Sequence, residues 1–115
     1  MAPFSHAVET NGFVLVTGQM PDTPETPGVL PEGIVAQTHA VMANLHKVLT
    51  GVGLGFEHVA MARIYLTHFE QDYAAMNEAY RSYFAADRLP ARVCVGVTGL
   101  AYGALIEIEL IARRP

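Results

Sequence analysis

Two segments near the end of the chain carry charged and apolar residues at alternating positions. In 92–98, Arg92 and Cys94 alternate with valines, and in 104–112, Glu107 and Glu109 alternate with isoleucine and leucine. Side chains of a strand point alternately to its two faces. We therefore expect each strand to pack its apolar face on the helices and to place the arginine, the cysteine and the glutamates close together on the opposite face.

Charges in the middle of a sheet need partners, because burying them alone costs several kcal/mol. They are expected to be solvated, to pair across a subunit contact, or to line a polar cleft. The strand register is not determined by the sequence, so no specific pair is predicted. From alternation alone, an ion-pair network that holds an oligomer together is the favoured interpretation.

Three other residue types could do chemistry, and each has a simpler explanation. Asn77 lies on the apolar stripe of a predicted helix, where its amide either bonds to backbone or points into a site. His39 and His46 lack a third metal ligand, which favours a solvated helix face. Cys94 has no base beside it in the sequence, so a small buried side chain is preferred over a nucleophile. The chain has no phosphate-binding glycine loop and no nucleophile elbow.

The elements that must position these residues follow the order β-β-α-β-α-β-β. Asn11-Gly12 is a strong hairpin signal between two β-like segments. Apolar residues at helical spacing predict two helices, and the pattern favours an α+β layer with both helices on one face of a mixed or antiparallel sheet. The predicted strands are 4–10, 13–17, 58–67, 92–98 and 104–112, the predicted helices are 33–52 and 70–86, and a proline-rich surface loop covers 21–31.

Composition limits the function classes. The 115 residues suit a single domain over 1–115, and 51% of them are apolar while only 16% are charged. No apolar run approaches the roughly 18 residues that cross a membrane. The excess apolar surface is therefore expected at a subunit interface. A net charge of −4 with scattered cations argues against nucleic-acid binding.

Cysteine usage and the first residues indicate the compartment. The single cysteine excludes an intramolecular disulfide. Residues 1–8 contain no long apolar core with a basic flank, so no secretory signal is predicted there. A cytoplasmic protein is the expectation.

Nearly the whole chain, in order, carries short motifs of one protein family. The matching segments are Phe-Ser-His-Ala-Val (4–8), Val-Thr-Gly-Gln-Met-Pro (16–21), Gln-Thr (37–38), Asn-Leu (44–45), Tyr-Leu-Thr (65–67), Ala-Met-Asn-Glu-Ala-Tyr (75–80), Tyr-Phe (83–84), Pro-Ala-Arg-Val-Cys-Val (90–95) and Gly-Ala-Leu-Ile-Glu-Ile-Glu (103–109). In these segments the chain resembles the Rid family, also called YjgF or, in older usage, endoribonuclease L-PSP. The Pro-Ala-Arg and Ile-Glu-Ile-Glu segments at this spacing are the most specific.

The resemblance implies a chorismate-mutase-like α+β domain that assembles as a homotrimer with clefts between subunits. It implies hydrolysis of small 2-imino and 2-enamino acids, such as 2-iminopropionate, 2-iminobutyrate or 2-aminoacrylate, to keto acids and ammonia. The substrate partner is then a small carboxylate, and no metal or organic cofactor is implied.

The resemblance also implies residue roles. Arg92 matches the arginine that grips the substrate carboxylate, a role that suits a planar, always charged guanidinium. Glu107 matches the glutamate that orients the attacking water. The remaining matches lie in the cleft wall or near it and comprise Thr17, Gly18, Asn77 and the backbone at Cys94.

Three positions depart from the best-known deaminases and leave the substrate open. Phe4 stands where those proteins have a tyrosine and is expected to form an apolar wall, Gly96 where they have a glutamate, and Val93 where they have a small hydroxyl residue. Gly96 is expected to enlarge or empty the cleft. The alternatives are therefore a catabolic deaminase of a larger enamine acid, such as an aminomuconate, and a non-catalytic trimeric module that binds small carboxylates or acts like a chaperone. The ribonuclease activity in the older family name fits the acidic charge poorly.

Overall fold

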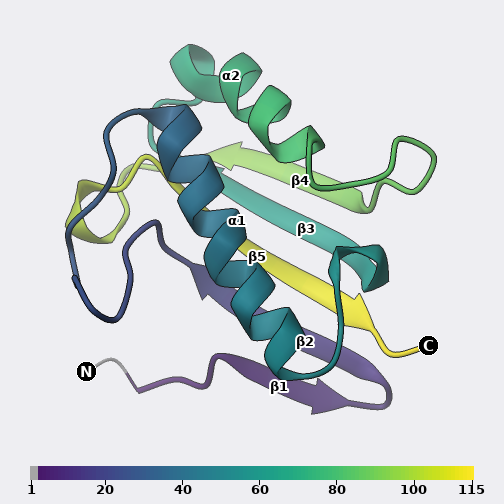
Figure 1. Cartoon of the computed structure of the whole chain (residues 1–115). Helices are drawn as coiled ribbons and strands as arrows, with labels where there is room; N and C mark the ends of the chain where they lie inside the picture. The colour runs from purple at the N-terminus through teal and green to yellow at the C-terminus, as the bar shows by residue number, and fades with distance from the viewer. Residues whose placement is uncertain (1–2) are drawn as a thin grey trace.

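Five strands form one mixed sheet, and both helices cover the same face of it (Figure 1). The computed structural model describes residues 3–115. The elements are β1 (Ala7–Thr10), β2 (Phe13–Gln19), α1 (Ile34–Gly51), β3 (Val59–Leu66), α2 (Phe69–Arg81), β4 (Ala91–Gly96) and β5 (Ile106–Arg113). The strands lie in the order β1-β2-β5-β3-β4, and only the β3–β4 pair is parallel. The predicted order of elements and the two-layer α+β class are confirmed.

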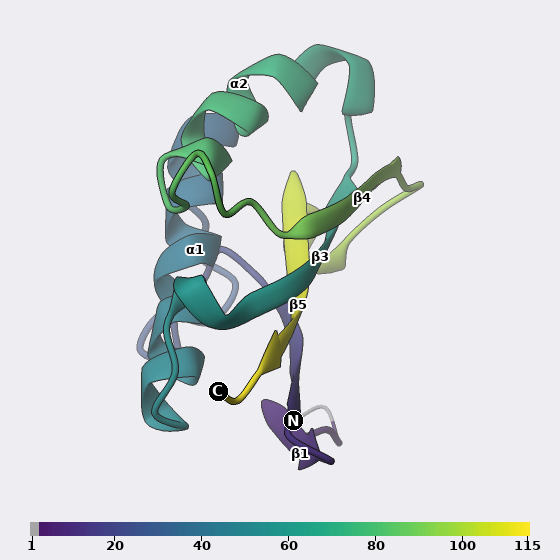
Figure 2. The ribbon, with the colours of Figure 1, turned by 90° about the vertical axis from the view of Figure 1, so that its right-hand side faces the viewer.

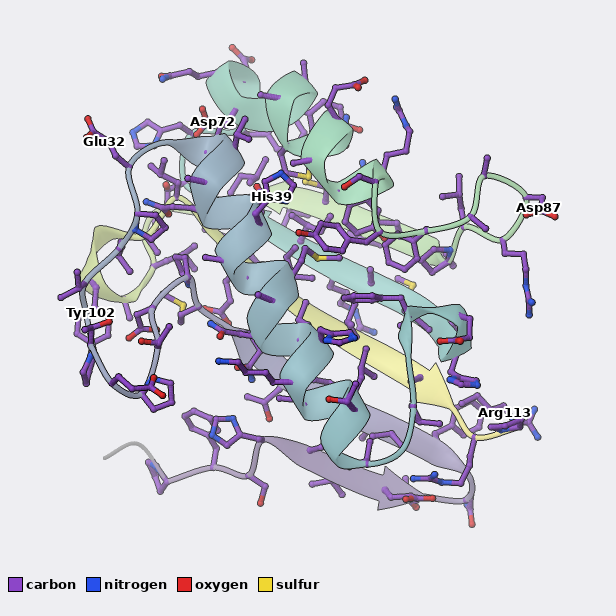
Figure 3. The ribbon with its side chains drawn as sticks, in the orientation of Figure 1. Glu32, His39, Asp72, Asp87, Tyr102 and Arg113 are labelled. Atoms are coloured by element: carbon purple, nitrogen blue, oxygen red, sulfur yellow. The ribbon has the colours of Figure 1, made fainter. Side chains whose placement is uncertain are left out.

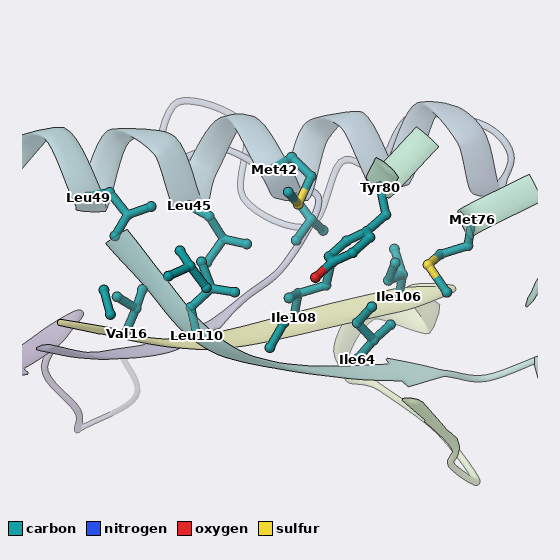
Figure 4. Packing of buried hydrophobic residues seen from close by; sticks show 14 of the residues in the cluster. Val16, Met42, Leu45, Leu49, Ile64, Met76, Tyr80, Ile106, Ile108 and Leu110 are labelled. Carbon is teal, nitrogen blue, oxygen red and sulfur yellow. The ribbon is translucent and has the colours of Figure 1, made fainter. Parts of the chain in front are cut away.

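The core fills the space between the helices and the sheet (Figure 4). Helix α1 contributes apolar residues at helical spacing, and the central strands contribute every second residue. Full burial of each such side chain stabilises the fold by about 1.5–3 kcal/mol. The fully buried members with the largest side chains are Met42, Leu45, Leu49, Ile64, Leu66, Met76, Ile106, Ile108 and Leu110.

The predicted β1–β2 hairpin is present. Asn11 and Gly12 both have positive φ, 50° and 79°, as a two-residue turn between twisted strands requires. The turn is held from the far end of the chain, since the backbone N–H of Arg114 donates to the Gly12 carbonyl (2.8 Å). The Arg114 side chain also pairs with Glu9 at 2.8 Å. This hairpin positions the end of β2, which belongs to the candidate site.

Strand β5 follows the predicted alternation. Ile106, Ile108 and Leu110 are buried under the helices, while Glu107 and Glu109 lie on the opposite face. We call that opposite face the open face, because neither helix covers it (Figure 2). The prediction for β5 is therefore correct in both phase and direction.

Strand β4 has the predicted alternation but the opposite orientation. Its register pairs Arg92 with Ala62 and Cys94 with Ile64, and both partners are fully buried under the helices. Arg92 and Cys94 therefore lie on the helix-covered face, and the expectation that the valines pack on the helices is wrong. The physical reason is the place of β4 at the sheet edge, where helix α2 offers polar and aromatic partners to a charged side chain.

The ends of several elements differ from the prediction by a few residues. Strand β4 ends at Gly96, and helix α2 ends at Arg81, after which hydrogen-bonded turns carry Tyr83 and Phe84 back to the core. Strand β1 begins at Ala7, and strand β5 begins at Ile106. Over residues 3–115, neither helix has the length and apolar character that a bilayer crossing requires.

The open face carries apolar side chains that remain exposed. Phe13, Leu15, Val93 and Val95 are 38%, 42%, 44% and 40% exposed, respectively. They come from β2 and β4 and flank the glutamates of β5 in the sheet order. The excess apolar surface expected from composition is thus concentrated on one face of the sheet.

Candidate functional site

Arg92 is held by two polar side chains of helix α2. Its Nη1 donates to the Asn77 side-chain oxygen at 2.7 Å, and its Nη2 donates to the Tyr73 hydroxyl at 3.2 Å. The guanidinium also lies over two aromatic rings, 5.7 Å from the Tyr73 centroid and 5.3 Å from that of Tyr80. Tyr73 and Asn77 are four residues apart and so face the same way from the helix.

The partners of Arg92 are uncharged. Within residues 3–115, no carboxylate lies within ion-pair distance of its guanidinium. An amide and a phenol orient the group while leaving its charge uncompensated, and a guanidinium has five N–H donors of which these contacts use two. Arg92 is therefore prepared to bind an anion, preferably a planar carboxylate that accepts two parallel bonds.

Cys94 lies two residues along β4 on the same face as Arg92. Burial raises the pKa of the Cys94 thiol, against a smaller lowering by the Arg92 charge. A thiol with a raised pKa is protonated at neutral pH and is a poor nucleophile. The structure thus agrees with a packing role for this side chain.

Glu107 lies on the open face against Gly18. A Cβ atom at Gly18 would overlap the Oε2 atom of Glu107, so only glycine allows the carboxylate to lie where it does. Burial, and to a lesser extent the charge of Glu109, raises the pKa of the Glu107 carboxyl. A carboxylate with a raised pKa is a better proton acceptor than an ordinary surface glutamate.

The neighbouring glutamate has different surroundings. Glu109 accepts a hydrogen bond from the Tyr65 hydroxyl and lies 3.8 Å from a guanidinium nitrogen of Arg63. Its charge is satisfied by these two partners, as the structural interpretation of the alternating charges predicted. Glu107 has no comparable hydrogen bond or ion pair among the described residues, which leaves it as the glutamate available for chemistry.

The N-terminal arm reaches the same region of β2. Thr17 donates a side-chain hydrogen bond to the Ser5 carbonyl, which ties the arm to the strand. Phe4 is 57% exposed and packs edge-on against the His6 ring, with ring centroids 5.9 Å apart. Phe4 and Gly18 line the same cavity of about 520 Å³. The structure therefore brings Phe4, Thr17, Gly18 and Glu107 into one neighbourhood.

The candidate residues form two half-sites on opposite faces of the sheet. Arg92, Asn77 and Cys94 lie on the helix-covered face at the β4 edge, whereas Glu107 and Gly18 lie at the open face on β5 and β2. Strand β3 separates β5 from β4 in the sheet. The expected proximity of Arg92 to the glutamates is thus wrong within one chain, because side chains cannot reach through a continuous sheet.

Gly96 does not leave an empty space. A Cβ atom there would lie 3.2 Å from the Cβ of Phe69, the first residue of α2. The Phe69 ring stacks on Tyr73 with centroids 4.8 Å apart. The expectation that Gly96 empties the cleft is therefore wrong, since Phe69 covers this position and extends the aromatic wall beside Arg92.

Sequence reasoning missed Tyr73 as a site residue. It was assigned to the apolar stripe of the second helix, although its hydroxyl contacts Arg92 and the ring is 37% exposed. Its spacing of four from Asn77 was the available signal. Phe69 carried no comparable signal, because its contact with Gly96 joins residues of different elements.

Metal binding has no support in the described part of the chain. No group of three or more histidine, cysteine, aspartate or glutamate side chains converges within residues 3–115. The two helix histidines have separate partners: His39 bonds to the Tyr83 hydroxyl at 2.6 Å, and His46 stacks on Phe56 with centroids 5.8 Å apart. His39 lies on the outer side of α1, beside the end of α2 (Figure 3).

Comparison with known proteins gives a consistent family. The family model described as endoribonuclease L-PSP matches residues 1–114. A RutC family protein of Aquifex aeolicus is 39% identical over 113 residues, which cover 97% of this chain and 89% of the relative. The 2-iminobutanoate/2-iminopropanoate deaminase of Mus musculus is 31% identical over 97% of this chain and 82% of its own.

A solved structure has the same fold. The crystal structure of E. coli TdcF with bound serine superimposes with a TM-score of 0.90 and 27% identity, covering 100% of this chain and 91% of that one. The ligand of that protein is a small amino acid with a free carboxylate.

Proposed function

The chain belongs to the endoribonuclease L-PSP, or Rid/YjgF, family, and on this premise we propose that it hydrolyses reactive 2-imino and 2-enamino acids to 2-keto acids and ammonia. The observation that carries the proposal is the Arg92 guanidinium, which is oriented by Asn77 and Tyr73 but not neutralised by them. The similarity to a named 2-iminobutanoate/2-iminopropanoate deaminase supports the choice of substrate. The absence of a spanning helix within residues 3–115 is consistent with action in the cytoplasm, which is part of the proposal.

The reaction needs one water and little activation, because an imine carbon is already electrophilic. Arg92 binds the substrate carboxylate, and Glu107 accepts a hydrogen bond from the water. The water oxygen adds to C2, the nitrogen takes up the protons, the C–N bond breaks, and 2-keto acid and ammonia leave. An enamine first takes a proton at C3 to become the imine. Positioning of this kind can supply several kcal/mol of the barrier reduction.

Arg92 and Glu107 can act on one substrate only if two chains contribute. One copy supplies the Arg92 half-site at its β4 edge, and a neighbouring copy supplies Glu107, Gly18 and Phe4. The exposed apolar residues of the open face support association through that face. We therefore place the substrate in clefts between the subunits of a homotrimer.

The proposal is tested by an ammonia-release assay on imines made in situ by an amino-acid oxidase, measured above the enzyme-free rate. Arg92→Ala is expected to lower kcat/KM for 2-iminopropionate by about a hundredfold, because loss of one partner of a desolvated charge pair costs about 2–5 kcal/mol. Arg88→Ala is the matched control, since Arg88 is an exposed cation in the loop after α2. Light scattering and circular dichroism establish that each variant keeps its mass and fold.

The outcomes separate the competing functions. Undiminished activity in a folded Arg92→Ala protein contradicts the assignment of the carboxylate site. Binding of a small keto acid without turnover in the wild-type protein favours the non-catalytic binding module. RNA cleavage that survives repurification and depends on salt would instead support a ribonuclease.

A further inference from the structure

The largest hollow of the described chain lies between the N-terminal arm, the loop that joins β2 to α1, and helix α1 itself. It has a volume of about 520 Å³, and its lining includes Phe4, Gly18, Met20, Pro24, Asn44 and Lys47. In Figure 1 the arm and this loop lie on the same side of α1. A 2-iminopropionate molecule contains only six non-hydrogen atoms, so the cavity is far larger than the smallest expected substrate.

The cavity wall is held in place by hydrogen bonds. The Asn44 side-chain nitrogen donates to the carbonyls of Met20 (2.8 Å) and Asp22 (2.6 Å). The Asp22 carboxylate in turn accepts from the backbone N–H of Gly28 at 2.8 Å. Tyr102 packs over Gly28 at the outer side of the loop (Figure 3). The loop therefore forms a preformed wall, and a ligand need not order it.

The charge in the cavity comes from the only lysine of the sequence, Lys47. Within residues 3–115, no carboxylate lies within 4.0 Å of its ammonium group. Asp22 is engaged with the loop backbone, and Glu25, the other acidic lining residue, is exposed. His6 contacts the Gln19 side chain at 3.4 Å. A ligand anion in this cavity therefore has Lys47 as its free cationic partner.

The cavity adjoins the proposed reaction centre through one residue. Gly18 lines the cavity and also contacts the Glu107 carboxylate, which we assign to the attacking water. An imino acid with its C2 atom near Glu107 can extend its side chain past Gly18. Met20, Pro24 and Val48 offer apolar contacts along the way to Lys47.

We propose that this cavity is a side-chain subsite for imino and enamino acids with an extended chain that ends in a second carboxylate, which pairs with Lys47. This inference rests on the proposed function for the position of C2. It adds the substrate class: dicarboxylic 2-imino acids with a chain of several carbons are preferred over 2-iminopropionate.

The first test is calorimetric binding of the stable keto acids 2-oxoadipate and 2-oxobutyrate to the intact assembly. The wild-type protein is expected to bind 2-oxoadipate about tenfold more tightly. Lys47→Met should remove this preference without changing the affinity for 2-oxobutyrate. Glu25→Gln should increase the preference, because it removes the like charge at the rim, and Arg88→Met is the matched control that should leave it unchanged.

The second test measures hydrolysis of 2-iminoadipate and 2-iminopropionate, made in situ from the amino acids. Lys47→Met is expected to raise KM for 2-iminoadipate about tenfold while the values for 2-iminopropionate stay unchanged. Equal effects on both imines, or no preference for 2-oxoadipate in the wild-type protein, would overturn the subsite. Selective, Lys47-dependent binding with no hydrolysis of either imine would uphold the subsite and refute the proposed deaminase function.

Discussion

Arg92 and Glu107 owe their different chemistry to their neighbours. Asn77 and Tyr73 contact Arg92 without compensating its charge, so the guanidinium keeps its capacity for a carboxylate. Glu107 lies against a glycine and next to a second glutamate, and both partial burial and that charge oppose its ionisation. In each case an unmet electrostatic need marks the residue as functional, whereas Glu109, with Tyr65 and Arg63 beside it, is structural.

Replacing Glu107 by glutamine tests its role as the water-orienting carboxylate. Glu107→Gln keeps the shape of the side chain but removes the proton acceptor, so kcat for 2-iminopropionate is expected to fall by about a hundredfold. KM should change much less, because the substrate carboxylate contacts Arg92. Steady-state ammonia release measures both constants, and an unchanged kcat would remove Glu107 from the mechanism.

The same variant should be more stable than the wild-type protein, with a defined pH dependence. The pKa of Glu107 is raised in the folded state by burial and by Glu109, so its ionisation destabilises the fold. The penalty is absent below the unfolded pKa of about 4.5, grows as pH rises through the folded pKa, and is complete above it. Thermal unfolding should therefore show a higher midpoint for Glu107→Gln at pH 7 and no gain near pH 3.5. A gain that is independent of pH would point to packing instead.

At the scale of elements, the loop between β2 and α1 shows how local contacts build the site. It contains most of the prolines of the chain, yet it is not held by a regular ladder. Its attachment to α1 runs through one side chain, Asn44, with two carbonyl acceptors on the loop. A site wall made in this way depends on a single residue of the neighbouring helix.

Asn44→Ala should loosen this loop. The carbonyls of Met20 and Asp22 lose their donor, and the loss is expected to lower the free energy of unfolding by about 1–3 kcal/mol. Urea denaturation measures this cost, and limited proteolysis should show faster cleavage within 20–28. Thr50→Ala, on the exposed face of the same helix, is the control and should cost less than about 1 kcal/mol. Equal effects of the two variants would contradict the bracing role of Asn44.

At the scale of the whole molecule, one sheet face is covered by helices and the other carries exposed apolar residues (Figure 2). A chain with 51% apolar residues has placed part of its excess on this open face, where a second copy can bury it. The same face carries Glu107, whose proposed partner Arg92 belongs to the opposite face. Assembly and catalysis are therefore expected to fail together.

Val95→Glu tests this coupling. Val95 lies on the open face and is 40% exposed, so a charge there would be buried without a partner in the assembly. Light scattering is expected to give three times the 12.4 kDa chain mass for the wild-type protein and a smaller species for the variant, with deaminase activity lost. Val35→Glu is the control, since Val35 is 48% exposed on α1. A full-size, active Val95→Glu assembly would exclude this face as the interface.

Patterns along the chain were sufficient for much of the architecture. The Asn-Gly turn, the helical stripe of α1 and the alternation of β5 each depend on residues close in sequence, and each was predicted correctly. The family resemblance added the candidate residues, including Arg92, Glu107 and Gly18. Their roles remain predictions until the variants are measured.

Contacts between distant elements determined the rest. Alternation along 92–98 showed that Arg92 and Val93 face opposite ways, but the choice of face depended on the pairing of β4 with β3 and on the partners offered by α2. The cover of Gly96 by Phe69 and the overlap of Gly18 with Glu107 likewise join residues that are far apart in the chain. Periodicity describes a strand relative to itself, whereas the side that a charge occupies is decided by the free energy of packing against neighbours that the local pattern does not specify.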